Sequence, residues 1–386
     1  MTQKLHETKE RQKRALLISL CDNSRKHRQD ESVAASDKIH DNSCQELRQL
    51  AQTLELEIAG QETVLLRDRQ PKYGMGSGKA GELAKIADEL EADILVFDWG
   101  LPPFSLSPSQ QRNWEDLSGI PVLDRQELII QIFAKRAATR EAELQVQLAE
   151  LNYRLPRLAH KYIDLSRQRG GRYGAKGTGE TRLETDRRQI ELRIHRLEKE
   201  IEEVAKQRQV QRRQRERQGL PVCAIVGYTN AGKSSLLNAL TGSSVLVEDK
   251  LFATLDATTR RFEPAPGTAA LLVDTVGFIR RLPHSLIRAF RSTLEEASLS
   301  SLLIHIIDTS DPDMVSCYQT TVSVLQELNA GEIPIITVLN KIDRLEDGGQ
   351  AALAAFPHGI AVSVKNGYGL DRLKRQIADQ LKGSIL

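Results

Sequence analysis

The octapeptide GYTNAGKS, at residues 227–234, has the residue types and the spacing that bind nucleotide phosphates. It matches G-x-x-x-x-G-K-S/T, in which glycines let the backbone wrap the phosphates at the start of a helix. Lys233 would reach the β- and γ-phosphates, and the Ser234 hydroxyl would bind Mg²⁺. The expected nucleotide contacts of this loop are Gly227, Tyr228, Thr229, Asn230, Ala231, Gly232, Lys233 and Ser234.

The tetrapeptide NKID, at residues 340–343, predicts which base is bound, because it directly follows the apolar run IPIITVL. The Asp343 carboxylate can accept hydrogen bonds from N1–H and the exocyclic amine of guanine. Adenine offers neither donor, and an unpaired buried acceptor costs about 1–3 kcal/mol. The Lys341 stem can cover the base, and SVK, at residues 363–365, would close over it through backbone groups. The expected guanine contacts are Asn340, Lys341, Ile342, Asp343, Ser363, Val364 and Lys365.

Two segments between these motifs would complete the phosphate site. In LLVDTVG, Asp274 stands at the end of a strand, where it can hold Mg²⁺ through water, and Gly277 can offer its N–H to the γ-phosphate. FATLD, at residues 252–256, lies where a switch loop is expected, and Thr254 is its natural metal ligand, although Thr258 and Thr259 also fit by position. The nucleotide contacts expected here are Phe252, Ala253, Thr254, Leu255, Asp256, Asp274, Thr275, Val276 and Gly277. Together, the five segments predict a GTP-binding domain that uses Mg²⁺.

The residue after Gly277 argues against fast GTP hydrolysis by the protein alone. Small GTPases place a glutamine there to orient the attacking water, whereas this chain has Phe278. We therefore expect slow intrinsic hydrolysis that a partner completes. Candidates for an arginine finger are Arg260, Arg261, Arg280 and Arg281.

The elements that must position these residues indicate an α/β protein with three domains. Residues 1–125 alternate strand-like runs such as ALLISL and DILVF with helix-like runs such as GKAGELAKIADELEA, which predicts a small domain with a mostly parallel sheet. The stretch PPFSLSPSQQ reads as a loop. From residue 220 to 386 the alternation returns, which predicts a second, doubly wound domain closed by the helix GLDRLKRQIADQL.

Residues 126–219 read as helix without strands and carry two apolar seams of about 3.5-residue period. The seams consist of Leu144, Leu148, Leu151, Leu155, Leu158, Tyr162 and Leu165, and of Ile190, Ile194, Leu197, Ile201 and Val204. A basic, glycine-rich stretch, RGGRYGAKGTGETRLETDRR, separates them. This pattern predicts a long antiparallel hairpin with the glycine-rich loop at its tip and a kink at Pro156; a helical spacer is the alternative.

Composition excludes several classes of protein. The 386 residues carry a formal net charge of only +2, so overall charge does not indicate a nucleic-acid binder. The four cysteines are far apart, which argues against a disulfide framework or a zinc site. No apolar run approaches 18 residues, and the N-terminus lacks an apolar signal core. We therefore expect a soluble, cytoplasmic protein.

The chain resembles the HflX GTPases over nearly all of its length after the first dozen residues. The resemblance is carried by GSGKAGEL, SPSQQRNWED, GTGETRLETDRR, GYTNAGKSSLLNAL, FATLDATTRR and DTVGFIRRLPHSLIRAFRSTLEEA. It implies that Thr254 is the switch ligand of Mg²⁺, beside Ser234. Together with Lys233 and Gly277 from the motifs above, Thr254 is expected to form the catalytic group. The loop departs from the family's usual RQGGGIGTRGPGETQ, since it has more basic residues and lacks the proline.

The resemblance also implies a partner, the large ribosomal subunit, near whose peptidyl-transferase RNA the glycine-rich loop would lie. Members with bound GTP are implied to separate the ribosomal subunits or keep them apart, and this chain is expected to act as a monomer. Basic side chains of the loop can meet RNA phosphates, and the candidates are Arg167, Arg169, Arg172, Lys176 and Arg182. The basic run at residues 205–218 would add RNA affinity or serve as a solvated linker. The alternatives are a GTPase of ribosome assembly or tRNA modification, and a scaffold that binds nucleotide only for stability.

Overall fold

The computed structural model describes residues 11–22, 44–66, 68–99, 105–168, 178–217, 219–244, 248, 250–281, 286 and 291–383. Its contacts divide the chain into two compact units. The first comprises Met1–Gln131 and Pro156–Gly174, and the second comprises Ile132–Leu155 and Ala175–Leu386. The division into three domains at residues 125 and 219 stays a prediction.

The first unit is built on a four-stranded parallel sheet. Its strands are β1 (Arg14–Asp22), β2 (Glu57–Leu66), β3 (Ile94–Trp99) and β4 (Val122–Asp124), in the order β2-β1-β3-β4. The crossovers that parallel strands require are helical: residues 44–53, α2 (Ser77–Glu89) and α3 (Pro108–Ser118). The core on the side of α2 and α3 is aromatic, since the rings of Phe97 and Tyr73 pack against Trp114 at centroid distances of 4.8 and 5.6 Å.

Helix α3 corrects the sequence interpretation of PPFSLSPSQQ as a loop, which is wrong for residues 108–111. Ser107 is the N-cap: its hydroxyl accepts from the Gln110 backbone at 3.2 Å, and the Gln110 side chain accepts from the Ser107 backbone at 3.1 Å. This reciprocal pair is a capping box, and Pro108 occupies the first helical turn, where its missing N–H costs nothing. The proline and serines therefore begin a helix instead of breaking one.

A buried arginine joins three elements of the first unit at the carboxyl ends of its strands. Arg125 follows β4, and its side chain is 2% exposed. Its guanidinium binds Asp98 of β3 at 3.2 Å and Glu46 of the helix at residues 44–53 at 3.0 Å. Both carboxylates are themselves buried, so their charges depend on Arg125 for compensation.

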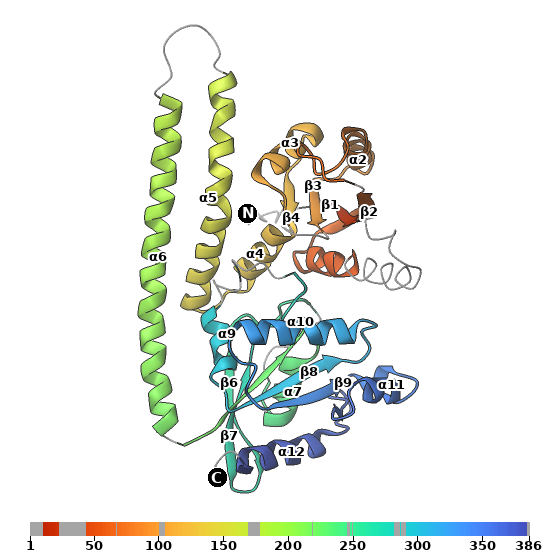
Figure 1. Ribbon diagram of the computed structural model, residues 1–386, viewed down its shortest axis with the longest axis vertical. Helices are drawn as coiled ribbons and strands as arrows, with labels where there is room; N and C mark the ends of the chain where they lie inside the picture. The colour runs from red at the N-terminus through yellow and green to blue at the C-terminus, as the bar shows by residue number, and fades with distance from the viewer. Residues whose placement is uncertain are drawn as a thin grey trace, which may run out of the picture. The chain divides into compact units, whose positions relative to one another are not determined.

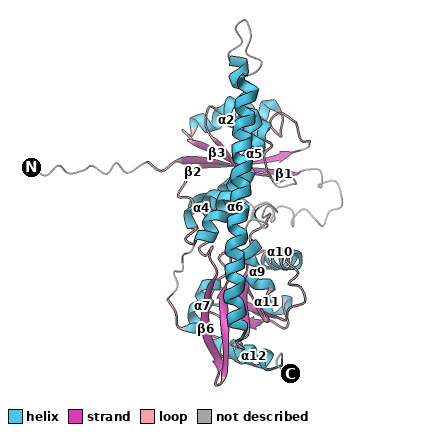
Figure 2. Ribbon diagram, turned by 90° about the vertical axis from the view of Figure 1, so that its left-hand side faces the viewer, coloured by secondary structure: helices cyan, strands magenta, loops and turns pink. Residues whose placement is uncertain are grey.

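Two long helices follow the first sheet along the chain. Helix α4 (Arg125–Arg136) leads to α5 (Arg140–Gln168), which continues through Pro156, and α6 (Thr178–Arg217) is unbroken in Figure 2. Where both helices lie in the second unit they contact each other, since Arg140 at the start of α5 binds Glu200 of α6 at 2.7 Å. Glu141 likewise binds Arg208. From the expected seams, Leu144 and Leu197 are buried. No helix in the described part of the chain is long and apolar enough to span a membrane.

The second unit contains a six-stranded sheet of order β10-β9-β8-β5-β7-β6. Its strands are β5 (Val222–Gly227), β6 (Thr258–Ala265), β7 (Thr268–Asp274), β8 (Leu302–Asp308), β9 (Ile335–Asn340) and β10 (Ile360–Ala361). All neighbours are parallel except β6, which pairs antiparallel with β7 at the edge. Because the parallel strands end on one side, the segments that follow β5, β7, β9 and β10 meet there.

Helices cover both faces of this sheet (Figure 1). Helices α7 (Lys233–Thr241) and α12 (Leu370–Gly383) bury leucines and isoleucines against one face. Helices α10 (Met314–Glu327) and α11 (Gln350–Ala355) pack on the other, where Met314, Tyr318 and Leu353 surround Ile307 and Leu339. Helices therefore pack against these strands on both faces of the sheet. The loops that follow the strands are in this way held close together at one edge.

Replacing Arg125 with methionine should destabilise the first unit by about 3–5 kcal/mol, because two buried carboxylates lose their counter-charge. Both tryptophans of the chain, Trp99 and Trp114, lie in this unit's core, so denaturant unfolding followed by tryptophan fluorescence reports on it. Arg14→Met is the control: its bonds to Glu57 and Glu91 are more exposed, and their loss should cost no more than about 1 kcal/mol. Equal unfolding midpoints for Arg125→Met and the wild type would contradict the assigned role.

Candidate active site

The loop between β5 and α7 has a backbone that only glycine can adopt at two positions. Gly227 has φ 152°, and a Cβ there would lie 2.3 Å from the carbonyl oxygen of Ile306. Gly232 has φ 101°, and its Cβ would lie 2.5 Å from the Asn340 amide nitrogen. The glycines of the phosphate-loop pattern therefore allow the loop to pack directly on β8 and on the end of β9.

Lys233 begins α7 and is buried within the loop. Its ammonium donates to the carbonyl oxygens of Tyr228 at 2.8 Å and Gly227 at 3.3 Å. Burial lowers the pKa of Lys233 to about 8, while the nearby negative charge of Asp274 opposes that change. A phosphate would provide further compensation for this desolvated charge.

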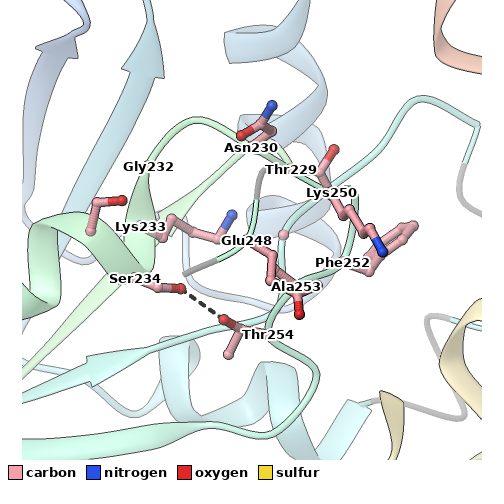
Figure 3. Close-up of a pocket in the computed structure, with 12 residues that line it drawn as sticks. Thr229, Asn230, Gly232, Lys233, Ser234, Glu248, Lys250, Phe252, Ala253 and Thr254 are labelled. Carbon is pink, nitrogen blue, oxygen red and sulfur yellow. Dashed lines mark hydrogen bonds between the residues drawn. The ribbon is translucent and has the colours of Figure 1, made fainter. Parts of the chain in front are cut away.

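Two hydroxyls and a carboxylate converge beside Lys233. The Ser234 hydroxyl donates to Asp274 at 2.6 Å and lies 2.7 Å from the Thr254 hydroxyl (Figure 3). Burial raises the pKa of Asp274, against the lowering effects of Lys233 and of both hydroxyls. The second Asp274 oxygen is buried and has no hydrogen-bond partner among the described residues. The donor set consists only of hard oxygens and therefore fits Mg²⁺.

No group of three histidine, cysteine, aspartate or glutamate side chains within the described ranges could hold a metal ion by itself. This agrees with the way Mg²⁺ is usually bound, by one or two side chains together with phosphate and water oxygens. The Ser234, Thr254 and Asp274 cluster could thus hold the ion only jointly with a nucleotide.

The segment after β7 is hydrogen-bonded to the phosphate loop. The Thr229 N–H donates to the Phe278 carbonyl at 2.7 Å, and the Phe278 N–H donates to the Gly227 carbonyl at 3.1 Å. A Cβ on Gly277 would lie 2.8 Å from both the Lys233 ammonium and Thr229 Cα, so only glycine allows this approach. Phe278 is 1% exposed, and its ring is therefore part of the core.

The segments after β9 and β10 form a second cluster of polar side chains. The Asn340 amide donates to the Ala231 carbonyl at 2.9 Å and accepts from the Val364 N–H at 3.2 Å. The Ser363 hydroxyl donates to the exposed Asp343 carboxylate at 2.6 Å, and this bond is the main reason that the pKa of Asp343 is lowered. Asp343 is thus an ionised acceptor at the surface, with the charge needed to bind two guanine donors.

Two adjoining cavities connect these groups. The first is lined by Thr229, Asn230, Gly232, Lys233, Ser234, Ser235, Glu248, Lys250, Phe252, Ala253, Thr254 and Gly277 (Figure 3). The second is lined by Asn230, Gly232, Ser235, Asn238, Glu248, Asn340, Lys341, Asp343, Arg344, Val364 and Lys365. They share four residues, so the side with the phosphate loop and the side with Asp343 form one continuous surface.

Some expected site residues lie elsewhere. Leu255 and Ile342 are buried in the core, and the Thr275 hydroxyl donates to the Ile225 carbonyl at 2.7 Å. The Asp256 carboxylate accepts from the backbone N–H groups of Ala138 and Thr139. Their roles toward GTP stay predictions.

Sequence reasoning also missed some of the lining residues. They are Ser235, Asn238, Glu248, Lys250 and Arg344. Ser235 and Asn238 could have been found as neighbours of the phosphate-loop motif on α7, whereas nothing in the sequence marks Glu248 or Lys250.

The RNA-contact candidates lie in a part of the chain with little description. Arg169, Arg172 and Lys176 fall outside the described residues, and Arg167 and Arg182 are described only as helical backbone. Their contacts with RNA therefore stay predictions.

Three family models match successive parts of the chain. Residues 41–134 match one described as GTP-binding GTPase N-terminal, and residues 136–215 match one described as GTP-binding GTPase middle region. Residues 222–341 match one described as 50S ribosome-binding GTPase. Together they cover most of the chain in its own order.

Known proteins also resemble most of the chain. A crystal structure of a GTP-binding protein from Sulfolobus solfataricus in complex with GDP is 25% identical, with 96% of this chain and 99% of that one covered and a TM-score of 0.46. GTPase HflX from Escherichia coli is 42% identical over 82% of this chain and 73% of its own length. GTPase HflX from Akkermansia muciniphila is 46% identical over 88% of this chain and 80% of its own. The chain therefore belongs to the HflX family of P-loop GTPases.

Proposed function

We propose that this GTPase hydrolyses GTP with Mg²⁺ at the two adjoining cavities, and that it binds the large ribosomal subunit to split ribosomes or prevent their reassociation. The observation that carries the chemical part is the convergence of Ser234, Thr254 and Asp274 beside Lys233. This group lies at one end of a surface whose other end presents Asp343.

Each group in the site has a chemical role that follows from its position. The Lys233 ammonium would exchange its loop carbonyls for phosphate oxygens, and backbone N–H groups at the start of α7 would bind the same charge. The Ser234 and Thr254 hydroxyls would hold Mg²⁺, with Asp274 binding its water ligands. When bound, Mg²⁺ would supply positive charge that offsets the negative charge developing on the phosphate during hydrolysis.

Among the described residues, the position after Gly277 does not carry the glutamine that orients the attacking water in small GTPases. Phe278 is apolar and buried where a glutamine would be useful. Arg280, a candidate arginine finger, donates to Asp313 of the α10 N-cap at 2.9 Å. Phe278 in place of a glutamine, and the ion pair that holds Arg280 to Asp313, support slow intrinsic hydrolysis that a partner accelerates.

The ribosomal part of the proposal rests on the family and on charge. The family matched by residues 222–341 is described as a 50S ribosome-binding GTPase, and the basic, glycine-rich stretch follows α5 in the sequence and continues into the start of α6. Arginine and lysine in such a stretch can meet RNA phosphates. We propose that the protein acts in the cytoplasm, where ribosomes lie, and that it does so as a monomer.

Changing Asp343 to asparagine should reverse the choice of base. The amide would present a donor where guanine also has one, so GTP affinity should fall at least tenfold, while binding of xanthosine triphosphate should improve. Titration of both nucleotides against both proteins measures the change. Asp347→Asn is the control, since Asp347 lies outside the cavity-lining residues and should alter neither affinity. Unchanged GTP affinity in Asp343→Asn would refute the base assignment.

Purified large ribosomal subunits should stimulate GTP turnover, and high salt should abolish this effect if the contact is electrostatic. Replacing Arg169, Arg172 and Lys176 with glutamine should weaken subunit binding and flatten its salt dependence by about one unit per lost phosphate contact. A matched control replaces Arg372, Lys374 and Arg375 of α12 and should bind like the wild type. Turnover indifferent to ribosomes would contradict the partner, whereas unchanged binding by the loop variant would contradict only the loop's role.

A further inference from the structure

The segment at residues 250–256, which we term the switch segment, faces two parts of the second unit. Lys250, Phe252, Ala253 and Thr254 line the first cavity (Figure 3). Other groups of the same segment contact the junction of α4 and α5, at residues 133–139. These contacts join residues more than a hundred positions apart, and the residues of the α4–α5 junction lie outside the five nucleotide-binding segments.

The first contact is aromatic. The ring of Phe252 packs edge-on against Phe133 of α4, with centroids 4.6 Å apart and an angle of 82° between the planes. Both rings are almost completely buried. Phe252 has φ 55°, a left-handed conformation that is unfavourable for a bulky residue and persists only where its surroundings hold it. The contact with Phe133 is therefore a means of holding the backbone of the switch segment.

The second contact is a helix cap. The Thr139 hydroxyl precedes α5 and accepts from the Ala142 N–H at 3.2 Å, as an N-cap does. The same hydroxyl donates to the Asp256 carboxylate, which also accepts from the N–H groups of Ala138 and Thr139 at 3.2 Å each. A carboxylate at this position is stabilised by the positive end of the helix dipole.

The third contact is ionic. Arg136, the last residue of α4, binds Glu248 at 2.5 Å, and this bond is the main reason that the pKa of Glu248 is lowered. Glu248 lines both cavities. The α4–α5 junction therefore contacts two residues that line the first cavity, Phe252 and Glu248, and a third, Asp256, at the end of the switch segment.

Thr254 lies between two of the residues that contact the α4–α5 junction, two positions after Phe252 and two before Asp256. We call these two residues the anchors of Thr254. Its hydroxyl must stay within about 3 Å of Ser234 to share a metal ion. We infer that Phe133, Arg136 and Thr139 are positioning residues that hold Thr254 at the metal site, so that binding of Mg²⁺·GTP and the start of α5 are energetically coupled. This inference rests on the proposed function, because it assigns a regulator to the same site.

The coupling has a direction that can be tested. A switch threonine contacts the metal in the triphosphate state and not in the diphosphate state. Loosening its anchors should therefore weaken triphosphate binding selectively. By linkage, a triphosphate analogue should tighten the first turn of α5 by the same factor.

The experiment compares Thr139→Val, Thr139→Ser and Phe133→Leu with the full-length wild type. Affinities for GDP and for the non-hydrolysable analogue GppNHp are measured with Mg²⁺ by calorimetry. Thr139→Val and Phe133→Leu should lose about fivefold to tenfold in GppNHp affinity and stay within twofold of wild type for GDP. Thr139→Ser, which keeps the hydroxyl, should restore GppNHp binding. Ser107→Ala removes a comparable helix cap in the first unit and should change neither affinity.

Hydrogen exchange of the same proteins supplies a second readout. GppNHp should protect the amides of Ala142 and Glu143 in the wild type, and this protection should shrink in Thr139→Val. Equal losses for GDP and GppNHp, or no loss, would overturn the inference while leaving the proposed function intact. A wild type that binds neither nucleotide would overturn both.

Discussion

The side-chain amide of Asn340 is the interaction that the geometry of the site depends on. It is buried, donates to the phosphate loop at Ala231 and accepts from the segment after β10 at Val364. Three segments that are distant in sequence are thereby held by one planar group whose donor and acceptor are both used. Lys341 adds a further bond to the loop at Asn230 and an ion pair with Asp308 of β8, at 2.8 and 2.7 Å. These bonds hold the phosphate loop and the segments that carry Asp343 and Val364 in one arrangement.

Two buried charged side chains, Lys233 and Asp274, depend on this fixed arrangement of segments. Lys233 and Asp274 are both desolvated, which pushes the pKa of the lysine down and that of the aspartate up, and each opposes the other's shift. Neither charge could be held at this depth without the other and without the hydroxyls and carbonyls that surround them. A site that already bears the cost of desolvation needs little reorganisation when a charged ligand replaces the internal contacts.

Local patterns in the sequence were enough to predict a small, mostly parallel sheet, a second sheet with a doubly wound fold, and the segments that meet at the edge of the second sheet. The spacing of the glycines and the preceding strand identified the phosphate loop. The position of NKID after an apolar run identified the polar cluster that contains Asn340 and Asp343. The strand β6 was missed because TTRRFEPA has neither an apolar run nor a regular alternation. Helix α3 was missed because its first turn contains proline and serine, which also occur in loops.

Other features could not have been predicted, since they depend on contacts between distant residues. Phe133 and Phe252, or Asp256 and Thr139, leave no periodic signal in the chain. The ion pairs of the buried Arg125 could not be predicted either, because its partners Asp98 and Glu46 come from two other elements. The sequence thus specifies which groups do chemistry more clearly than it specifies what holds them.

The two edges of the six-stranded sheet have a consequence for how copies of the chain meet. Strand β10 has only two residues, and β6 exposes Arg260, Arg261 and Glu263, contains Pro264 and has an irregular register before Ala265. Short length, charge, proline and a bulge are the features by which natural sheets discourage another strand from adding to an edge. Both edges therefore disfavour pairing with a strand of another molecule. This protects the sheet from edge-to-edge aggregation between copies of the chain.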